Sequence, residues 1–317
     1  MTCRIALLDD YQGVALAMAD WGRLPDCEVV SFREPMADES TLARALTDFD
    51  VVMAMRERTR ITAALSARLP RLRLIVTAGA RNAAIDVAAA TARGIVVCGT
   101  GSLKYPTAEL TFGLMLALAR DIPAQQQRLR AGGWQTRVGR SLYGATLGII
   151  GLGNLGSRVA RIAQAYEMKV LAWSRNLTDE RARAEGARRV ELDELLAASD
   201  FVTIHLVLSD RSRGLVGAAQ LARMKPTAYL INTSRGPIVD MTALIAALHE
   251  GRIGGAGLDV YDAEPLPPDH PILAAPRTVL TPHLGYVVEE GYRMFYGETL
   301  EDIEAWRAGT PIRVVNA

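Results

Sequence analysis

Three polar side chains in the second half of the chain each follow a short apolar run that is typical of a strand. They are Arg235, Glu264 and His283, which come after the runs 229–233, 256–260 and 278–280. Because ligands bind at the carboxyl ends of the strands in a parallel sheet, we expect the three side chains to face one site. An anion-binding cation, a carboxylate and an imidazole together predict a redox site for a small carboxylate.

The three residues match the needs of hydride transfer to a 2-oxo acid. The planar fork of Arg235 can hold the substrate carboxylate and polarise the carbonyl group. His283 can protonate the developing alkoxide, because an imidazole gains and loses a proton near neutral pH. Glu264 can hold the other ring nitrogen and stabilise the protonated ring. Each residue alone could equally be structural, as a surface arginine, a loop carboxylate or a hydrogen-bonded histidine, so the prediction rests on the set.

A glycine-rich motif precedes these residues, between the strand-like run 145–150 and an apolar-periodic helix. That context is the one that a dinucleotide-binding fingerprint requires. Its first glycine allows a tight turn, its second lets the backbone approach a pyrophosphate, and its third allows close packing of helix on strand. The alternative is a glycine turn that only packs. The motif predicts cofactor binding by Gly151, Gly153, Asn154, Leu155 and Gly156.

The end of the next strand predicts which nicotinamide cofactor is used. An Asp or Glu at this position usually bonds the ribose of NAD. Here Ser174 and Arg175 follow the strand-like run 169–173, without a carboxylate. A guanidinium makes charge-assisted bonds to a 2′-phosphate, so NADP is favoured. NAD is the alternative, bound through Ser174 and the backbone with Arg175 in solvent.

Composition excludes several other classes of function. Half of the 317 residues are apolar, which is enough for a sizeable core. The chain has 36 Lys and Arg against 35 Asp and Glu, and a net charge of +1 favours neither nucleic acid nor a membrane surface as partner. The three cysteines, Cys3, Cys27 and Cys98, are far apart in the sequence, which predicts reduced thiols, a cytoplasmic protein and no metal site. The N-terminus does not resemble a signal peptide. The apolar run 110–119 is about half the length of a membrane span.

The order of apolar runs predicts an α/β protein of two domains with parallel sheets. Strand-like runs at 4–10, 29–32, 51–55, 72–77 and 95–98 alternate with short helical segments, and a long helix follows at 106–130. A second alternation starts at 145 and is typical of a doubly wound domain. A helix at 289–308 closes the chain. We expect one domain boundary near residue 100, while composition alone does not place the second.

Several motifs, in order, resemble the D-isomer-specific 2-hydroxyacid dehydrogenases over nearly the full length. They are the segments 84–97, 151–156, 204–208, 224–236, 257–260, 264–265 and 282–283. The resemblance implies two Rossmann-like or flavodoxin-like domains, with a nucleotide-binding domain (101–289) inserted into a substrate domain (1–100 plus 290–317). It implies that Arg235, Glu264 and His283 are catalytic. It also implies a homodimer built largely on residues 106–131.

The resemblance also assigns residues that the spacing alone did not. It implies that Thr233 and Asp259 line the nicotinamide pocket, and that the cofactor is also contacted by Leu206, Val207, Ser212 and Gly285. The backbone at Gly79 and Ala80 should meet the substrate carboxylate. The chain departs from the family pattern in three places, one of them Val207 in place of a usual proline. Arg81 replaces a frequent glycine and lies either beside that carboxylate or in solvent, and Tyr286 replaces a small residue.

Tyr286, with Tyr292 and Phe295 nearby, could form an aromatic patch that favours a bulky or apolar 2-oxo acid over glyoxylate. Ordinary packing between domains is the alternative. The strand end at 55–58 could also reach the site. We therefore predict an NAD(P)-dependent D-2-hydroxyacid dehydrogenase that reduces a small 2-oxo acid. The alternatives are a nucleotide-sensing, corepressor-like protein of the same fold and a dehydrogenase for another small anion, such as formate or phosphite.

Overall fold

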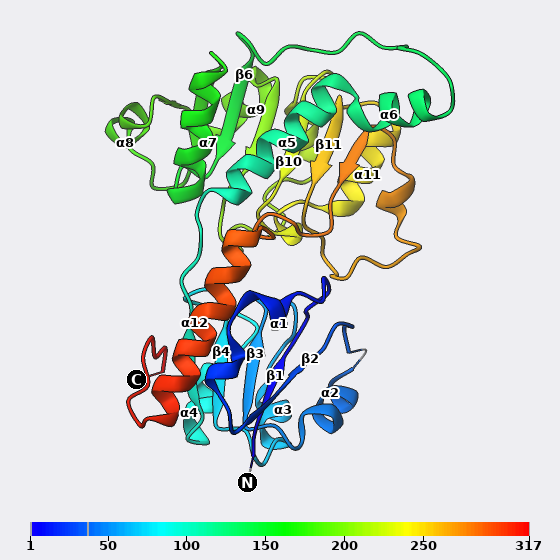
Figure 1. The fold of residues 1–317 in the computed structure, drawn as a ribbon. Helices are drawn as coiled ribbons and strands as arrows, with labels where there is room; N and C mark the ends of the chain where they lie inside the picture. Colours follow the sequence, from blue (N-terminus) through cyan, green and yellow to red (C-terminus); the bar gives the residue numbers. More distant parts are fainter. Residues whose placement is uncertain (1, 37, 317) are drawn as a thin grey trace. The chain divides into compact units, whose positions relative to one another are not determined.

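The computed structural model describes residues 2–36 and 38–316. Contacts divide the chain into two compact units, one formed by residues up to Leu103 together with those from Val288 onward, and one formed by Lys104–Val287. The sequence placed these divisions at 100 and 289. Each unit holds one parallel sheet (Figure 1).

The first unit contains a five-stranded parallel sheet with the strand order β2-β1-β3-β4-β5. This is the flavodoxin-like doubly wound order. Its strands are β1 (Cys3–Leu7), β2 (Cys27–Ser31), β3 (Val51–Ala54), β4 (Leu74–Thr77) and β5 (Val96–Gly99). The central strands β3 and β4 are buried on both faces, which explains their unbroken apolar sequences.

Helices cover both faces of this sheet. One core joins Ala6, Leu8 and other side chains of the sheet to α2, α3 and α4. The opposite face meets α12, which also packs against α1. The helical segments of this unit are α1 (Ala15–Met18), η1 (Trp21–Arg23), α2 (Glu39–Leu46), α3 (Ala63–Ala67), α4 (Val87–Ala92) and α12 (Glu289–Arg307).

The second unit contains a seven-stranded parallel sheet with the order β12-β11-β10-β9-β6-β7-β8. The strand order reverses between β6 and β9, and open α/β sheets bind their ligands at such a reversal. The strands are β6 (Thr146–Ile150), β7 (Lys169–Trp173), β8 (Arg188–Arg189), β9 (Phe201–Ile204), β10 (Tyr229–Asn232), β11 (Gly255–Leu258) and β12 (Thr278–Leu280).

Two apolar layers hold helices on the two faces of the second sheet. One joins the sheet to α9, α10 and α11. The other joins it to α5, α7 and α8. These helical segments are α5 (Pro106–Arg120), α6 (Ile122–Arg130), α7 (Asn154–Ala165), α8 (Asp179–Ala184), α9 (Leu192–Ala198), α10 (Ala218–Arg223), η2 (Gly236–Ile238), α11 (Met241–His249) and η3 (Pro271–Ala274).

The α/β class and the parallel sheets confirm the sequence prediction, but the predicted helix at 106–130 is interrupted. Asp121 adopts a left-handed conformation with φ 55°, which ends α5 and starts α6. The sequence placed no helix at α3, α8 or α10 and no strand at β8, because such short segments carry too little periodicity. Among the described residues, no helix is both long and apolar enough to span a membrane.

Candidate active site

The segment after β10 fixes the backbone that carries Arg235. The buried Asn232 side chain donates a hydrogen bond to the Arg235 carbonyl (2.9 Å) and accepts one from the Ser234 amide (3.0 Å). The Ser234 hydroxyl donates to the carbonyl of Leu206, beyond the neighbouring strand β9. The half-buried Arg235 guanidinium donates to the Ser234 carbonyl at 2.7 Å. Side chains of the strand end therefore hold the arginine in place.

A glycine brings the Arg235 segment against the loop that carries Glu264. A Cβ atom added at Gly236 would lie 2.1 Å from the carbonyl carbon of Tyr261. No side chain fits at that separation without moving one of the two backbones. Gly236 thus sets the distance between two of the candidate catalytic loops.

Glu264 and His283, which are 19 positions apart, are in direct contact. Glu264 Oε2 lies 2.5 Å from His283 Nδ1, and Glu264 Oε1 accepts a hydrogen bond from the Tyr261 amide at 2.8 Å. The two side chains are 30% and 21% exposed. The carboxylate is therefore held at both oxygens, and the opposite ring nitrogen, Nε2, is directed away from it. This arrangement leaves Nε2 to exchange a proton with a bound molecule.

A second carboxylate holds the loop that carries the histidine. Asp259 accepts hydrogen bonds from the Thr281 hydroxyl (2.6 Å) and from the amides of Leu284 (2.7 Å) and Gly285 (2.8 Å). Burial raises the pKa of this carboxyl above its usual range, although these bonds favour its charged form. His283 itself has φ 53°, which is costly for a non-glycine residue. The bonds to Asp259 hold the loop on either side of it.

Two threonines on α5, which the sequence prediction missed, also position the site. The Thr107 hydroxyl donates to the Gly285 carbonyl at 2.8 Å. The Thr111 hydroxyl lies 2.9 Å from that of Thr233. Their spacing of four residues, which places both on one helix face, was the only sequence signal.

The glycine-rich motif has the local geometry that its sequence predicts. Gly151 has φ 104°, and a Cβ at Gly156 would lie 2.1 Å from the Gly151 carbonyl oxygen. A Cβ at Gly153 would meet nothing within 4 Å, so this part of the backbone is open to a ligand. Helix α7 begins directly afterwards at Asn154, and its Leu155 packs against the neighbouring core. The open turn at a helix N-terminus fits a pyrophosphate.

The residues after β7 and β9 border the same edge of the sheet. Arg175 is exposed and makes no hydrogen bond or ion pair with the residues that the structure describes, while the Leu152 amide donates to Ser174 Oγ at 3.5 Å. Val207 is 85% exposed beside the half-buried Leu206. The Ser212 hydroxyl instead donates to the Val207 carbonyl (2.8 Å) and accepts from the Ser209 amide (2.8 Å). It therefore holds its own loop together.

His205, directly after β9, is the half-buried histidine of this region. Its Nε2 lies 3.0 Å from the Thr203 hydroxyl, and its Nδ1 is buried with no hydrogen-bond partner among the described residues. Burial lowers the pKa of His205 to about 3, so the ring is neutral at neutral pH. The carbonyl of His205 also faces Gly151, where a Cβ would lie 2.7 Å from it.

The predicted substrate residues Gly79, Ala80 and Arg81 lie in the first unit, directly after β4. Gly79 has φ 90°, and its amide donates to the Thr100 hydroxyl at 2.8 Å. Ala80 and Arg81 are exposed. A guanidinium nitrogen of Arg56 lies so close to Gly79 that an added Cβ would be 2.1 Å away. The prediction noted the strand end at 55–58 but did not assign Arg56 to the site.

The predicted aromatic patch is divided between the two units. Tyr286 belongs to the second unit, where its ring meets His283 edge-on with centroids 5.4 Å apart. Tyr292 and Phe295 belong to α12 in the first unit, where both are buried, and Tyr292 packs edge-on against Tyr296. Tyr286 is thus in contact with a candidate catalytic residue of its own unit.

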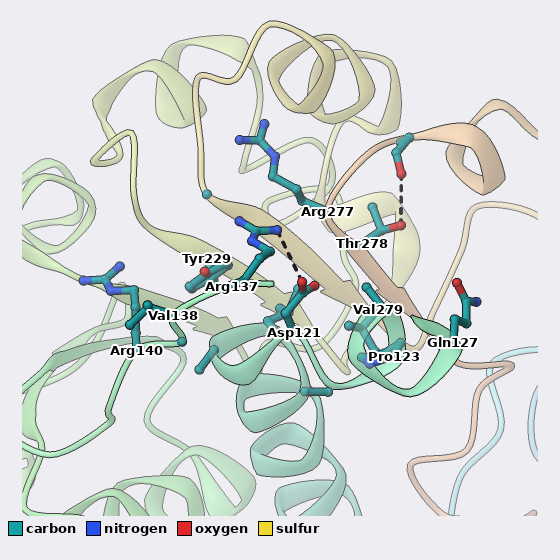
Figure 2. A pocket seen from close by; sticks show the side chains of 17 residues that line it. Asp121, Pro123, Gln127, Arg137, Val138, Arg140, Tyr229, Arg277, Thr278 and Val279 are labelled. Carbon is teal, nitrogen blue, oxygen red and sulfur yellow. Dashed lines mark hydrogen bonds and ion pairs between the residues drawn. The ribbon is translucent and has the colours of Figure 1, made fainter. Parts of the chain in front are cut away.

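The cavity drawn in Figure 2 is separate from these residues. It has a volume of about 250 Å³ and is lined by the starts of β10 and β12 and by the end of α5. Tyr229 and Thr278, which open those strands, mark the edge of the sheet opposite the candidate site. No cluster of metal-binding side chains occurs among residues 2–36 and 38–316.

Comparison with known proteins decides the family. The model for the NAD-binding domain of D-isomer-specific 2-hydroxyacid dehydrogenases matches residues 112–285. A glyoxylate reductase from Aeropyrum pernix is 38% identical over 302 residues, which are 92% of this chain and 90% of that protein. The chain belongs to the D-isomer-specific 2-hydroxyacid dehydrogenases.

Solved structures of similar dehydrogenases agree with this membership. A phosphoglycerate oxidoreductase from Vibrio cholerae o395 matches with a TM-score of 0.92 and 34% identity, covering 97% of this chain and 99% of that chain. A D-lactate dehydrogenase from Aquifex aeolicus, complexed with NAD and lactic acid, matches with a TM-score of 0.81 and 25% identity, covering 99% of each. This dehydrogenase is therefore an oxidoreductase that acts on CH–OH groups with a nicotinamide cofactor.

Proposed function

We propose that this dehydrogenase reduces a small 2-oxo acid to the D-2-hydroxy acid. The observation that carries the proposal is the contact between Glu264 and His283, at 2.5 Å, on a loop that Asp259 holds in place. When bound, the nicotinamide cofactor supplies the hydride. His283 Nε2 donates the proton to the developing alkoxide, and Glu264 holds the imidazole through Nδ1. Arg235 binds the carboxylate and polarises the carbonyl group.

The first unit is proposed to form the rest of the substrate site, as the substrate domain of residues 1–100 plus 290–317. The amides of the 79–81 loop would receive the substrate carboxylate. Support comes from the turn at Gly79, which has a positive φ at a strand end, from the exposed Ala80 and Arg81 that follow it, and from the Arg56 guanidinium beside Gly79. The domain of residues 101–289 would bind the cofactor.

NADP is proposed as the preferred cofactor. Arg175 supports this choice, because it is exposed at the end of β7 and has no carboxylate partner among the described residues. A 2′-phosphate would give it a charge-assisted partner. Ser174, Thr233, Asp259 and Gly285 are proposed to contact the cofactor, together with Leu206, Val207 and Ser212.

The proposed substrate has an apolar side chain. The ring of Tyr286 meets His283 edge-on, which puts an aromatic surface next to the imidazole that would protonate the substrate. Apolar surface there favours a 2-oxo acid with a methyl or larger group over glyoxylate, which offers only a hydrogen.

A homodimer in the cytoplasm is proposed as the working form. Most of α5 is buried in its own unit, whereas α6 has no buried residue. Large apolar side chains are exposed along α6 and the segment after it: Ile122, Leu129, Trp134, Val138 and Tyr143. Such a patch supports contact with a second copy. Sedimentation of the protein with and without Trp134→Glu and Val138→Glu tests this. The free thiols suit a reducing compartment.

A turnover panel tests the proposed function. The protein would be mixed with NADPH or NADH and with glyoxylate, pyruvate, hydroxypyruvate and phenylpyruvate, and cofactor oxidation would be followed by absorbance. We expect turnover with higher kcat/KM for NADPH and for the substrates that carry a side chain. Tight cofactor binding without turnover would instead identify a nucleotide sensor. Turnover with formate or phosphite alone would reassign the substrate.

A further inference from the structure

Two cysteines that are distant in the sequence lie opposite each other in the first unit. Cys3 opens β1, Cys27 opens β2, and the two strands pair in parallel with Cys3 directly opposite Cys27. Neighbouring strands are about 4.8 Å apart, which is within the range of Cα separations that a disulfide spans. Both residues are half-buried and both thiols are free. The pair can therefore be bridged with little movement of the backbone.

A guanidinium from α12 distinguishes the two thiols. Arg307 Nη1 donates to the sulfur of Cys27 at 3.3 Å, and the same guanidinium lies 3.9 Å from Asp26. A guanidinium that donates to a sulfur also orients that sulfur for disulfide exchange, in which a thiolate is the nucleophile. Burial, followed by the neighbouring Cys27, raises the pKa of Cys3 to about 12. Cys27 is therefore the attacking sulfur and Cys3 the resolving one.

A cavity beside this pair is lined by Cys3 and by Arg307, the residue that contacts Cys27. It has a volume of about 630 Å³ and is lined by Cys3, Asp50, Arg71, Arg73, Trp306 and Arg307, with Thr2 and Pro70. Arg71 is paired with Asp50 at 2.9 Å and Arg307 with Asp26 at 3.9 Å, so the positive charge of Arg73 has no ion-pair partner among the described residues. Positive walls attract and concentrate anions.

We propose that Cys3 and Cys27 are a redox-active dithiol that an anionic low-molecular-weight disulfide oxidises to a reversible bond between β1 and β2. The Cys27 thiolate attacks one sulfur of the reagent, which forms a mixed disulfide and releases one thiolate. Cys3 then gives up its proton and attacks the Cys27 sulfur, which releases the second thiolate. Two cysteine thiols are oxidised, the reagent disulfide is reduced to two thiols, and the two cysteine protons end on them.

The disulfide would connect the edge strand of the first sheet to the neighbouring strand. Strand β2 is an edge strand that pairs only with β1 among the strands of this sheet. The last turn of α12 also contacts this region, through Arg307 and through the ion pair between Glu304 and Arg23. The disulfide would thus join the edge strand covalently to the centre of its unit, and would slow proteolysis of the segment between the two cysteines.

Oxidation of the full-length protein by dithiodipropionate, a dianionic disulfide, tests the proposal. After alkylation of the remaining thiols, mass spectrometry should find the peptides of Cys3 and Cys27 joined and Cys98 alkylated only after unfolding. The buried Cys98, whose pKa burial raises to about 12, is the matched control, and Cys98→Ser should react like the wild type. The Cys3→Ser variant should form a mixed disulfide between Cys27 and the reagent that persists. The Cys27→Ser variant should not react with the reagent. A persistent mixed disulfide in the wild type, or reaction only after unfolding, would overturn the proposal.

Two further comparisons test the assigned roles. Arg307→Gln should slow the reaction about tenfold, because the positive charge and hydrogen bond beside Cys27 are lost, whereas Arg307→Lys should restore most of the rate. The neutral 2-hydroxyethyl disulfide should react more slowly than dithiodipropionate at low salt, and the difference should shrink at high salt. Equal rates for the two reagents at low salt would overturn the anionic class, and an unchanged rate in Arg307→Gln would overturn the role of Arg307.

Discussion

At the scale of single residues, the candidate site consists of polar groups that have positioning partners within their own unit. Glu264 holds His283, Asn232 holds the backbone of Arg235, and Asp259 holds the loop on which His283 lies. Each candidate catalytic group thus has a positioning partner. Such support matters because a small misplacement of a reacting group reduces the rate strongly.

The proton-donating role of His283 gives the first prediction. His283→Gln keeps a polar side chain of similar size but cannot transfer a proton, so kcat should fall by at least about 100-fold. The dissociation constant for NADPH, measured by fluorescence titration, should stay within about threefold, because the change removes no cofactor contact that we propose. His249→Gln, at the end of α11, is the control and should keep wild-type activity. Near-normal turnover in His283→Gln would remove this histidine from the mechanism.

The exposed Arg175 gives a prediction about the cofactor. Arg175→Ala should reduce kcat/KM with NADPH by about tenfold or more, since a charge-assisted bond to phosphate is lost, and should leave NADH nearly unchanged. Arg183→Ala removes an exposed arginine of α8 that is ion-paired with Glu180, and serves as the control. Equal losses with the two cofactors would argue against recognition of a 2′-phosphate.

At the scale of elements, the site depends on how strand ends and α5 pack together. Parallel strands bring the segments after β10, β11 and β12 to one edge, and the Thr107 and Thr111 hydroxyls join α5 to two of those segments. Gly236 fixes the spacing between the loops that carry Arg235 and Glu264. The relative positions of the catalytic groups within this unit therefore depend on backbone packing as well as on hydrogen bonds.

Gly236 gives the prediction at this scale. In Gly236→Ala the new Cβ would lie 2.1 Å from the Tyr261 carbonyl carbon, so the two loops must move apart. We expect kcat to fall more than about tenfold and the unfolding free energy to fall by about 1–3 kcal/mol, as overpacking costs. Gly217→Ala is the matched control, because the nearest atom there is 3.7 Å away. If Gly236→Ala kept the wild-type kcat in buffer without denaturant, as Gly217→Ala should, then the spacing of the two loops would not determine the catalytic rate.

At the scale of the whole molecule, each unit is a doubly wound sheet with its own apolar core. The first unit is built from two segments of the chain, the residues up to Leu103 and those from Val288 onward. Burial in these cores also affects how stability depends on pH. His205 directly follows β9 in the second unit, its Nδ1 is buried, and burial of the ring lowers its pKa to about 3. The unfolded chain, with an ordinary histidine pKa near 6.5, binds a proton on this ring that the folded chain excludes.

That difference predicts a loss of stability on acidification. Well above pH 6.5 the ring is neutral in both the folded and the unfolded state, and the full contribution of His205 to the unfolding free energy is present. As the pH falls below 6.5, only the unfolded state gains the proton, so the unfolding free energy should decrease by about 2 kcal/mol between pH 7 and pH 5 from this residue alone. Urea unfolding of His205→Gln should show a correspondingly weaker pH dependence, and His249→Gln should follow the wild type. Identical pH profiles for the wild type and His205→Gln would show that His205 does not cause the loss.

The sequence by itself determined the α/β class, most of the long elements and the three candidate catalytic side chains. It could do so because strand periodicity, glycine turns and strand-end polar residues are local signals, and because parallel strands necessarily end at one edge. Local signals do not determine which distant residues meet. Strand order and packing determine which distant groups meet. They set the break at Asp121, the support that Asp259 and α5 give to the site, and the pairing of Cys3 with Cys27. They also place Tyr286 beside His283 and Tyr292 in the other unit. Only the tertiary structure decided them.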